Sequence, residues 1–380
     1  MKITAVHAHV MEAPIEEHFA FSQAWVDKRV GTVIEIETDA GITGWGDVYG
    51  PPWIVAAVIE KAYAPMLIGE NPLAGDAIWE RLHNSLRDHG QRGVAIQALS
   101  GVDIALWDIR GKHFGAPVHV LMGGPLRSEV KAYATGLYRR SMDQDENIAI
   151  LSEEAGGYIN QGFGAMKLKV GFGFDYDMTL IEILRGIIGF DVDLFMDANH
   201  GYDLVQAKKL ALAAEAYDIG WFEEPVAPED LESYRELRRI TTIPIAGGEC
   251  SFTRFDFRAI LESPRAMDII QPDTASAGGL TECKKIADMA VAHGARYNPH
   301  VWGTGIGLAT AMQLLAVLPL TVPGVAAHVP MLEYDQTPHP FRQGLLVDPI
   351  QVENGVAYVP EGPGLGVEIK RDVLERYKVN

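Results

Sequence analysis

Residues 166–170 alternate strictly between apolar and basic side chains. Met166, Leu168 and Val170 are separated by Lys167 and Lys169. Successive side chains of a β-strand point to opposite faces, so the two lysines share one face and the apolar residues share the other. The meaning of this pattern depends on whether the lysine face meets water or the interior of a larger sheet.

Short apolar segments alternate with longer helical patterns between residues 126 and 339. This alternation predicts parallel βα units. Eight strand candidates fit a closed barrel, a fold whose size begins at about 200 residues. The candidates are residues 130–136, 165–170, 193–199, 221–225, 243–249, 267–273, 295–300 and 325–333.

The segments on either side of this region have a different pattern. Residues 1–125 predict an α+β domain, with a hairpin turn at Asp39–Gly41. Residues 340–380 contain another hairpin pattern and a short helix, which we expect to pack back onto the first domain. We therefore predict a capping domain of residues 1–125, completed by 340–380, and a barrel of residues 126–339. The expected cap strands are 2–11 and 30–38, and the expected cap helices are 53–67, 74–88 and 92–113.

The composition is that of a globular protein with a strong acidic excess. The 380 residues exceed the size of most single cores, which favours two domains, and the formal net charge is −19. This charge disfavours binding to nucleic acids or anionic membranes. An anionic substrate would need local positive charge at its binding site. The two cysteines, Cys250 and Cys283, are too few for a disulfide framework.

The sequence favours a protein of the cytoplasm. The first residues lack the apolar core and cleavage site of a signal peptide, so we expect none. Residues 297–332 contain no charged Asp, Glu, Lys or Arg side chain, which would also suit a membrane span. Prolines and glycines interrupt this stretch, and we predict a buried strand, helix and strand there.

Polar residues recur at the carboxyl ends of the predicted barrel strands. Starting from Lys169, they follow at intervals of 28, 26, 26, 24, 27 and 33 residues, which is about the length of one βα unit. Barrel active sites are built at this face from the ends of several strands. The periodicity therefore predicts one site formed by Lys167, Lys169, Asp197, Glu223, Glu249, Asp273, His300 and Glu333.

The three central carboxylates predict a metal site. Asp197, Glu223 and Glu249 would repel one another if they converged without a cation or a proton. An all-oxygen set favours Mg²⁺, with Mn²⁺ as a close second. A helix cap or a surface ion pair is the alternative for any one acid, but it fits three acids in register poorly. Glu224 should face away from Glu223 because side chains alternate, so we take Glu223 as the ligand.

The lysine face should then look into the barrel mouth, beside the metal. A nearby cation and a second ammonium lower the pKa of a lysine toward neutrality, which suits a general base. We assign this role to Lys169. Lys167 would bind the substrate carboxylate, although either lysine could simply balance the acidic charge.

The histidine of NPHVWGTG predicts a second acid–base group. Asp273 precedes His300 by one βα unit, and an aspartate that holds an imidazole fixes its tautomer and raises its basicity. Lys169 and His300 would approach a bound substrate from opposite faces. Glu333 could donate a hydrogen bond to an oxygen on which charge develops.

Six short motifs in this order resemble the enolase superfamily, in its mandelate racemase and muconate lactonizing enzyme branch. The resemblance implies a (β/α)7β modified TIM barrel with an α+β cap, Mg²⁺ and a Lys or His base that forms an enediolate. One departure is Asp47, where the family commonly has Glu. The motifs are KLK (167–169), MDANHGY (196–202), WFEEP (221–225), GGE (247–249), QPD (271–273) and PHVWGTG (299–305).

Within this branch the sequence is similar to the galactarolactone cycloisomerase family. That resemblance rests on segments 86–93, 98–116, 131–136 and 339–343, together with the site motifs. It implies a sugar acid or its lactone as the substrate, with loss of the β-oxygen after proton abstraction. An acid-sugar dehydratase is the first alternative and a racemase or epimerase the second. The resemblance also implies a homo-oligomer.

Two further function classes remain open from the sequence. A non-catalytic sugar-acid binding protein would not need both bases and the three acids. His7 and His9 form the H-x-H pattern that opens a zinc site in some hydrolase barrels, but here it lies before the barrel. We expect specificity to come from a cap loop at residues 18–29. Candidate substrate-binding side chains are Lys167, Asn199, His200, Trp302 and, from the cap loop, Trp25.

Overall fold

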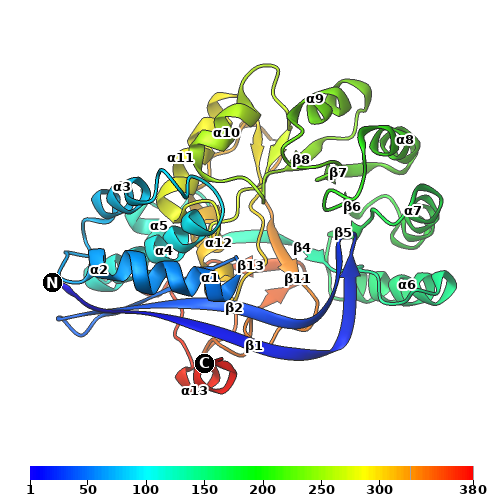
Figure 1. The fold of residues 1–380 in the computed structure, drawn as a ribbon. Helices are drawn as coiled ribbons and strands as arrows, with labels where there is room; N and C mark the ends of the chain where they lie inside the picture. Colours follow the sequence, from blue (N-terminus) through cyan, green and yellow to red (C-terminus); the bar gives the residue numbers. More distant parts are fainter. Residues whose placement is uncertain (326, 380) are drawn as a thin grey trace.

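The computed structural model describes residues 1–325 and 327–379 (Figure 1). Ala326, within the eighth predicted strand, and Asn380, at the end of the predicted tail, lie outside the described residues. The cap begins with an antiparallel sheet in the order β1, β2, β3. Its strands are β1 (Ile3–Phe21), β2 (Ala24–Thr38) and β3 (Thr43–Val48). Its helices are α1 (Pro52–Ala57), the π-helix η1 (Val58–Tyr63), α2 (Ala64–Leu67), α3 (Gly75–Ser85) and α4 (Val94–Phe114).

The segment 18–29, expected to be a cap loop, is instead the tip of the long β1–β2 hairpin. Both strands continue to a tight turn at Ser22 and Gln23, and in Figure 1 the hairpin crosses the molecule to reach the barrel near β5. The turn is anchored because Ser22 Oγ donates to the carbonyl of Ala198 (2.6 Å) and Gln23 Nε2 donates to that of Asn199 (3.0 Å). These contacts to a barrel loop could not be foreseen from the local sequence.

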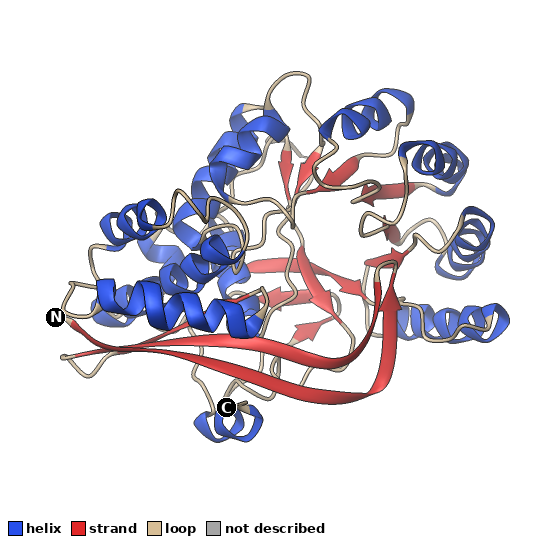
Figure 2. Cartoon of the chain, viewed as in Figure 1, coloured by secondary structure: helices blue, strands red, loops and turns tan. Residues whose placement is uncertain are grey.

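The barrel consists of parallel strands surrounded by helices, which Figure 2 shows as an outer ring. In the described chain eight strands alternate with seven helices, as the (β/α)7β prediction requires. The strands are β4 (Glu129–Thr135), β5 (Ala165–Lys169), β6 (Asp193–Asp197), β7 (Ile219–Glu223), β8 (Ile245–Gly247), β9 (Ile269–Ile270), β10 (Arg296–Tyr297) and β11 (Leu332–Asp335). The helices are α6 (Gln144–Asn160), α7 (Phe174–Ile188), α8 (Leu204–Ala214), α9 (Leu231–Ile240), α10 (Thr253–Leu261), α11 (Gly279–Ala292) and α12 (Gly305–Val317).

Several of these helices begin where the sequence supplies an acidic N-cap. Asp143, Asp203 and Asp230 each accept a hydrogen bond from a backbone N–H in the first turn of α6, α8 and α9. Asp203 also forms a capping box with Gln206. Such caps satisfy N–H groups that have no partner inside the helix. These caps fix the first residues of α6, α8 and α9, the helices that follow β4, β6 and β7.

The strands pair in the order β11, β4, β5, β6, β7, β8, β9, β10, and every neighbouring pair is parallel. Among the described residues, no ladder joins β10 to β11. Side chains bridge this gap instead. The N–H of Met331 donates to Asn298 Oδ1 (2.8 Å), and the N–H of Val301 donates to Glu333 Oε2 (3.0 Å).

The C-terminal tail divides between the two parts of the molecule. The hairpin of β12 (Val352–Glu353) and β13 (Val356–Tyr358) pairs with barrel strand β4, so it extends the barrel sheet rather than the cap. Helix α13 (Arg371–Tyr377) packs against β1, and Arg371 forms an ion pair with Glu35 of β2. Residues 364–365 also pack on the cap, where the N–H of Leu365 donates to Asp108 Oδ1 of α4 (2.9 Å).

Helix α4 forms the seam between the cap and the barrel. It packs on β3 on one side and on α11 on the other. Its buried Asp103 accepts hydrogen bonds from the N–H (2.9 Å) and hydroxyl (2.6 Å) of Thr281, in the first turn of α11. The helix ends at Gly115, whose left-handed backbone (φ 64°) suits glycine.

Within the charge-free stretch 297–332, α12 is the buried helix that was expected, but residues 318–325 and 327–331 form no strand, and Val322 and Val325 are exposed. Every residue of α12 is buried. None of the described helices is both long and apolar enough to cross a membrane.

Candidate active site

Lys167 and Lys169 of β5 point into the barrel, as their alternation with apolar residues predicts. Lys167 is 1% exposed, and its Nζ lies 2.7 Å from both Glu223 Oε1 and Glu333 Oε1. Burial lowers the pKa of this lysine, but the surrounding carboxylates raise it well above the ordinary value. The carboxylates of Glu223 and Glu333 therefore keep Lys167 in its charged form in this arrangement.

Lys169 lies one layer higher, at the carboxyl end of the strand. Its Nζ donates to Asp197 Oδ2 (2.5 Å) and to Asn199 Oδ1 (3.0 Å). Asn199 has a positive φ of 40°, a conformation that Asn tolerates better than most residues. The predicted base and a predicted substrate-binding amide are thus in direct contact.

The three predicted metal ligands lie at the same end of neighbouring strands. Asp197, Glu223 and Glu249 are at most 9% exposed. Glu223 Oε2 accepts hydrogen bonds from Trp221 Nε1 (2.9 Å) and Gln271 Nε2 (2.7 Å). Both contacts were missed from the sequence, although Gln271 belongs to the QPD motif.

Burial and neighbouring charge give these acids different pKa values. Burial raises the pKa of Glu223 to about 7 despite the opposing charge of Lys167, and burial likewise raises that of Glu249 to about 7 despite His300. Burial would also raise the pKa of Asp197, but Lys169 and Lys167 hold it at about 2. Keeping Glu223 and Glu249 ionised in this buried environment therefore costs free energy.

The predicted Asp–His pair is present. His300 Nδ1 lies 2.7 Å from Asp273 Oδ2, while Nε2 lies 3.4 Å from Glu249 Oε2. Burial lowers the pKa of His300, but Glu249 and Asp273 raise it to about 10. Tyr49, from the cap, packs its ring against the imidazole with centroids 5.3 Å apart. Contact with Tyr49 was not predicted, because cap and barrel are remote in sequence.

Glu333 closes the ring of site residues on β11. It is 1% exposed, accepts a hydrogen bond from Thr135 Oγ1 (2.7 Å) and pairs with Lys167. Burial would raise its pKa, but Lys167 and His300 hold it at about 2. It is an acceptor in this arrangement, so donation to a substrate oxygen would require it to take up a proton first.

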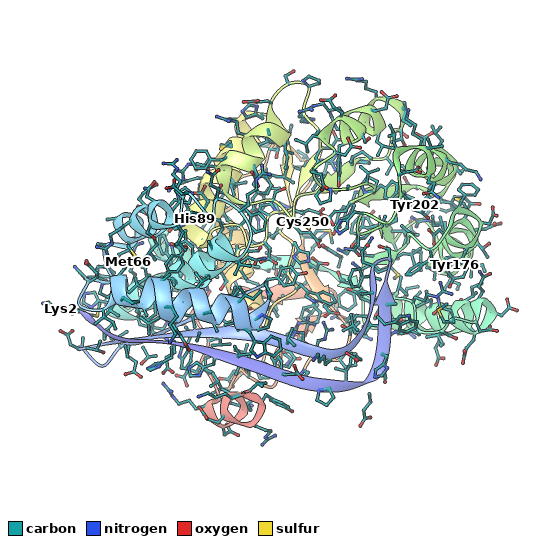
Figure 3. The ribbon with its side chains drawn as sticks, viewed as in Figure 1. Lys2, Met66, His89, Tyr176, Tyr202 and Cys250 are labelled. Carbon is teal, nitrogen blue, oxygen red and sulfur yellow. The ribbon has the colours of Figure 1, made fainter. Side chains whose placement is uncertain are left out.

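Glu224 does not face away from the site, which corrects the expectation from strand alternation. Strand β7 ends at Glu223, and Glu224 takes a left-handed backbone (φ 38°), so the period of two no longer applies. Its carboxylate is fully buried and lies 2.9 Å from Nδ1 of His200, a predicted substrate-binding residue. Cys250, which Figure 3 labels near the centre of the view, offers its thiol to the same cluster.

The predicted specificity residues Trp25 and Trp302 line a cavity of about 340 Å³ between the cap hairpin and the barrel. Tyr49 and His339 belong to the same lining. Trp25 is 47% exposed, whereas Trp302 stacks under the guanidinium of Arg29, 4.6 Å from its ring centroid. The hairpin tip and the loop after His300 therefore meet at the edge of the site.

The acidic excess at the barrel mouth fits a divalent cation. Six carboxylates gather there, and Lys167, Lys169, His200 and His300 are the facing cationic groups. Even with both imidazoles protonated, two negative charges remain uncompensated. Apart from the 2.9 Å ion-pair contact of its carboxylate with His200, Glu224 has no hydrogen-bond partner in the described chain. The six are Asp197, Glu223, Glu224, Glu249, Asp273 and Glu333.

Two family descriptions match almost the whole chain. Residues 2–123 match the mandelate racemase/muconate lactonizing enzyme N-terminal domain, and residues 151–373 match the enolase C-terminal domain-like family. The chain belongs to the mandelate racemase and muconate lactonizing enzyme branch of the enolase superfamily. It is therefore an enolase-superfamily enzyme, and the resemblance found in the sequence motifs is confirmed.

Relatives in this superfamily extend over the full length. D-galactarolactone cycloisomerase of Agrobacterium fabrum is 44% identical over 379 residues, which cover 100% of this chain and 99% of that protein. Arabinonate dehydratase of Saccharolobus solfataricus is 34% identical, with 90% and 89% coverage.

Solved structures share the same architecture. The 3,6-anhydro-D-galactonate cycloisomerase of Zobellia galactanivorans superposes with a TM-score of 0.90 at 38% identity, and each chain is covered completely. A racemase of Streptomyces coelicolor A3(2) with bound magnesium has a TM-score of 0.88 at 27% identity, covering 99% of this chain and 100% of that one. The predicted capped (β/α)7β barrel is thus confirmed.

Proposed function

We propose that the protein is a Mg²⁺-dependent cycloisomerase that opens the lactone of a sugar diacid to a keto-deoxy sugar diacid. The observation that carries this proposal is the position of Lys169 and His300. Lys169 ends β5 and His300 follows β10, and β6–β9 lie between these two strands in the sheet order. Both side chains are buried. The 44% identity to D-galactarolactone cycloisomerase over the full length supports the same reaction and substrate class.

Asp197, Glu223 and Glu249 would hold the Mg²⁺, and Mn²⁺ suits the same oxygen donors. When bound, the cation supplies charge that stabilises the dianion formed when a carboxylate loses its α-proton. Their burial and the raised pKa of Glu223 and Glu249 support this assignment, since a cation removes the cost of keeping these groups ionised.

In this mechanism one of Lys169 and His300 removes the proton α to the substrate carboxylate. The C–H electron pair moves into the enediolate, and its collapse expels the β-oxygen as the carboxylate of the opened lactone ring. The resulting enol takes up a proton on carbon to give the keto acid. The other member of the pair supplies a proton, Asp273 keeps Nδ1 of His300 protonated, and Lys167 binds the substrate carboxylate.

The substrate-facing groups would come from both parts of the chain. Asn199 and His200 lie at the end of β6, and Trp25 and Trp302 line the cavity under the cap hairpin. We propose that these side chains select the sugar acid. A cytoplasmic homo-oligomer remains our expectation for the assembled enzyme.

A dehydratase acting on an open sugar acid is the second candidate, and the dehydratase relatives at 31–34% identity favour it over a racemase. One experiment separates the two reactions. Purified protein with Mg²⁺ is incubated with D-galactarolactone and with open sugar acids, and products are analysed by NMR and mass spectrometry. A product with the mass of the lactone supports cycloisomerisation, whereas a product lighter by one water from an open acid supports dehydration.

A further inference from the structure

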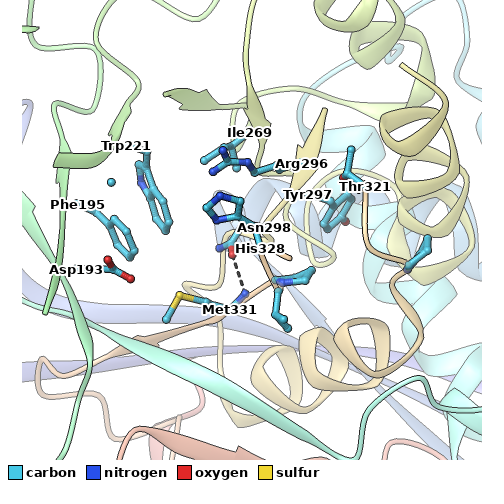
Figure 4. Close-up of a pocket in the computed structure, with 14 residues that line it drawn as sticks. Asp193, Phe195, Trp221, Ile269, Arg296, Tyr297, Asn298, Thr321, His328 and Met331 are labelled. Atoms are coloured by element: carbon cyan, nitrogen blue, oxygen red, sulfur yellow. Dashed lines mark hydrogen bonds between the residues drawn. The ribbon is translucent and has the colours of Figure 1, made fainter. Parts of the chain in front are cut away.

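A second cavity lies inside the barrel, at the end opposite the catalytic residues. It has a volume of about 130 Å³ and is bordered by the amino-terminal parts of β6, β7, β9 and β10 and by the segment that precedes β11 (Figure 4). The proposed mechanism uses none of its lining residues. The ones that matter here are Phe195, Trp221, Arg296, Asn298 and Met331.

Four of these residues stand one layer below the catalytic groups. Phe195, Trp221, Asn298 and Met331 each precede by two residues a member of the proposed active site, namely Asp197, Glu223, His300 and Glu333. Because side chains alternate along a strand, residues two apart share the inward face. The cavity and the active site are therefore consecutive layers of one barrel interior.

The cavity has an aromatic wall. The rings of Phe195 and Trp221 are stacked with an interplanar angle of 9°, and Met331 packs against the same small apolar cluster. Such a wall suits the apolar body of a small ligand.

Two hydrogen-bond donors without partners face this wall. Asn298 is 5% exposed, and its Oδ1 accepts the N–H of Met331, which fixes the orientation of the amide. Its Nδ2 is buried and has no partner in the described chain. A buried donor of this kind costs free energy unless something accepts its hydrogen bond.

Arg296 supplies the second donor. Its side chain is half-buried, and none of the side-chain hydrogen bonds or ion pairs of the described chain includes its guanidinium. Figure 4 shows Arg296 and Asn298 beside the imidazole of His328, across from Trp221. A guanidinium fork binds a carboxylate through two parallel hydrogen bonds.

We propose that this cavity is a second binding site, for a short-chain monocarboxylate. The carboxylate accepts hydrogen bonds from Arg296 and Asn298 Nδ2, and the short apolar chain packs on Trp221, Phe195 and Met331. A cavity volume of about 130 Å³ limits the ligand to a few carbon atoms. A ligand of this size binds with roughly millimolar affinity.

A ligand bound in this cavity affects the active site through Trp221. The ring that forms the cavity wall donates its Nε1–H to Glu223, so a ligand that fixes the ring also fixes this hydrogen bond. The effect of the ligand on the active site rests on the proposed function, because it takes Glu223 as a magnesium ligand. Carboxylate binding itself does not depend on that assignment.

Calorimetric titration of the metal-free full-length protein tests binding without any turnover. Propionate is the probe and propionamide, of nearly the same shape, is its neutral control. We expect saturable binding of propionate and at least about tenfold weaker binding of propionamide. The variants R296Q and N298D should weaken propionate binding by a similar factor, while R258Q, at an exposed arginine on α10, leaves it unchanged. N298D keeps the acceptor for Met331 and replaces the donor with a carboxylate oxygen, which repels the bound carboxylate.

If the wild type shows no saturable binding, or if R296Q and N298D bind propionate as tightly as the wild type, the proposed site is wrong.

The coupling between this site and the active site is then tested by titrating Mg²⁺ with and without propionate. We expect propionate to change the Mg²⁺ affinity by about fivefold in the wild type. The variant W221F keeps the aromatic wall and loses the N–H, so it should bind propionate and show no such change. An unchanged Mg²⁺ affinity in the wild type contradicts the coupling, and failure of the lactone assay leaves the propionate result intact.

Discussion

The carboxylate of Asp47, on cap strand β3, accepts a hydrogen bond from the backbone N–H of Thr304 at the start of barrel helix α12, with a distance of 2.7 Å. The same oxygen accepts the N–H of Gly307 (3.1 Å). A Cβ on Gly303 or Gly307 would collide with this oxygen, so two glycines make room for it. Asp47 therefore holds the loop that follows His300. The family commonly has Glu at the sequence position of Asp47.

Replacing Asp47 with Ala should destabilise the protein by about 1–2 kcal/mol, because two N–H groups at the helix start lose their acceptor. Turnover should fall as well, since the loop after His300 loses its anchor. Urea unfolding and steady-state kinetics measure the two effects. The matched control is D145A, at an exposed aspartate in the first turn of α6, which should change the free energy of unfolding by only about 0.5 kcal/mol. Equal effects of the two substitutions would contradict the role of Asp47.

The variant D47N should change how stability depends on pH. Burial raises the pKa of Asp47 to about 7, although Thr304 opposes this, whereas the unfolded chain keeps the ordinary value of 3.8. The folded state then binds more protons than the unfolded state between these values, so this group lowers stability as pH rises from 3.8 to about 7. Asn cannot ionise, so D47N should gain stability relative to the wild type as pH rises from about 4 to about 7. A constant difference across that range would contradict the raised pKa.

Asp273 should be required for the action of His300. The Nδ1 of His300 lies 2.7 Å from Asp273, and D273N removes the charge that fixes the imidazole tautomer. We expect a loss in kcat of about 100-fold or more. Since the two residues act as a unit, the double variant D273N/H300N should be no slower than H300N alone. Independent, multiplicative losses would argue against the dyad.

Mg²⁺ should stabilise the wild type against heat, because a ligand that binds only the folded state raises its apparent stability. E249Q removes one proposed ligand and should reduce this thermal shift strongly. E229Q, at an exposed glutamate in the loop after β7, is the control and should keep the full shift. Differential scanning fluorimetry with Mg²⁺ and after chelation measures both variants. A full Mg²⁺ shift in E249Q would exclude Glu249 from the metal site.

The sequence was sufficient for the barrel and for the placement of most candidate site residues, for a physical reason. Parallel strands bring their carboxyl ends to one face, so Lys169, Asp273 and His300 could be placed together from their spacing alone. The strand alternation also placed both lysines in the interior correctly.

What the sequence missed depends on contacts between distant segments and on local backbone conformation. The turn at Ser22 is held by the carbonyls of a loop 176 residues away. The carboxylate of Glu224 turns toward His200 because its φ is positive, which no side-chain pattern reveals. The contacts of Trp221 with Glu223 and of Tyr49 with His300 likewise exist only once the barrel and cap are assembled.

Turnover of D-galactarolactone in D₂O with Mg²⁺ by the wild type, K169A and H300N tests the two proposed bases most directly. The control is K131A, at an exposed lysine of β4. We predict that the wild type and K131A form a keto-deoxy diacid carrying solvent deuterium at the deoxy carbon, while K169A and H300N each lose about 100-fold or more in rate. Full turnover in both K169A and H300N would contradict their assignment as the proton-transfer pair.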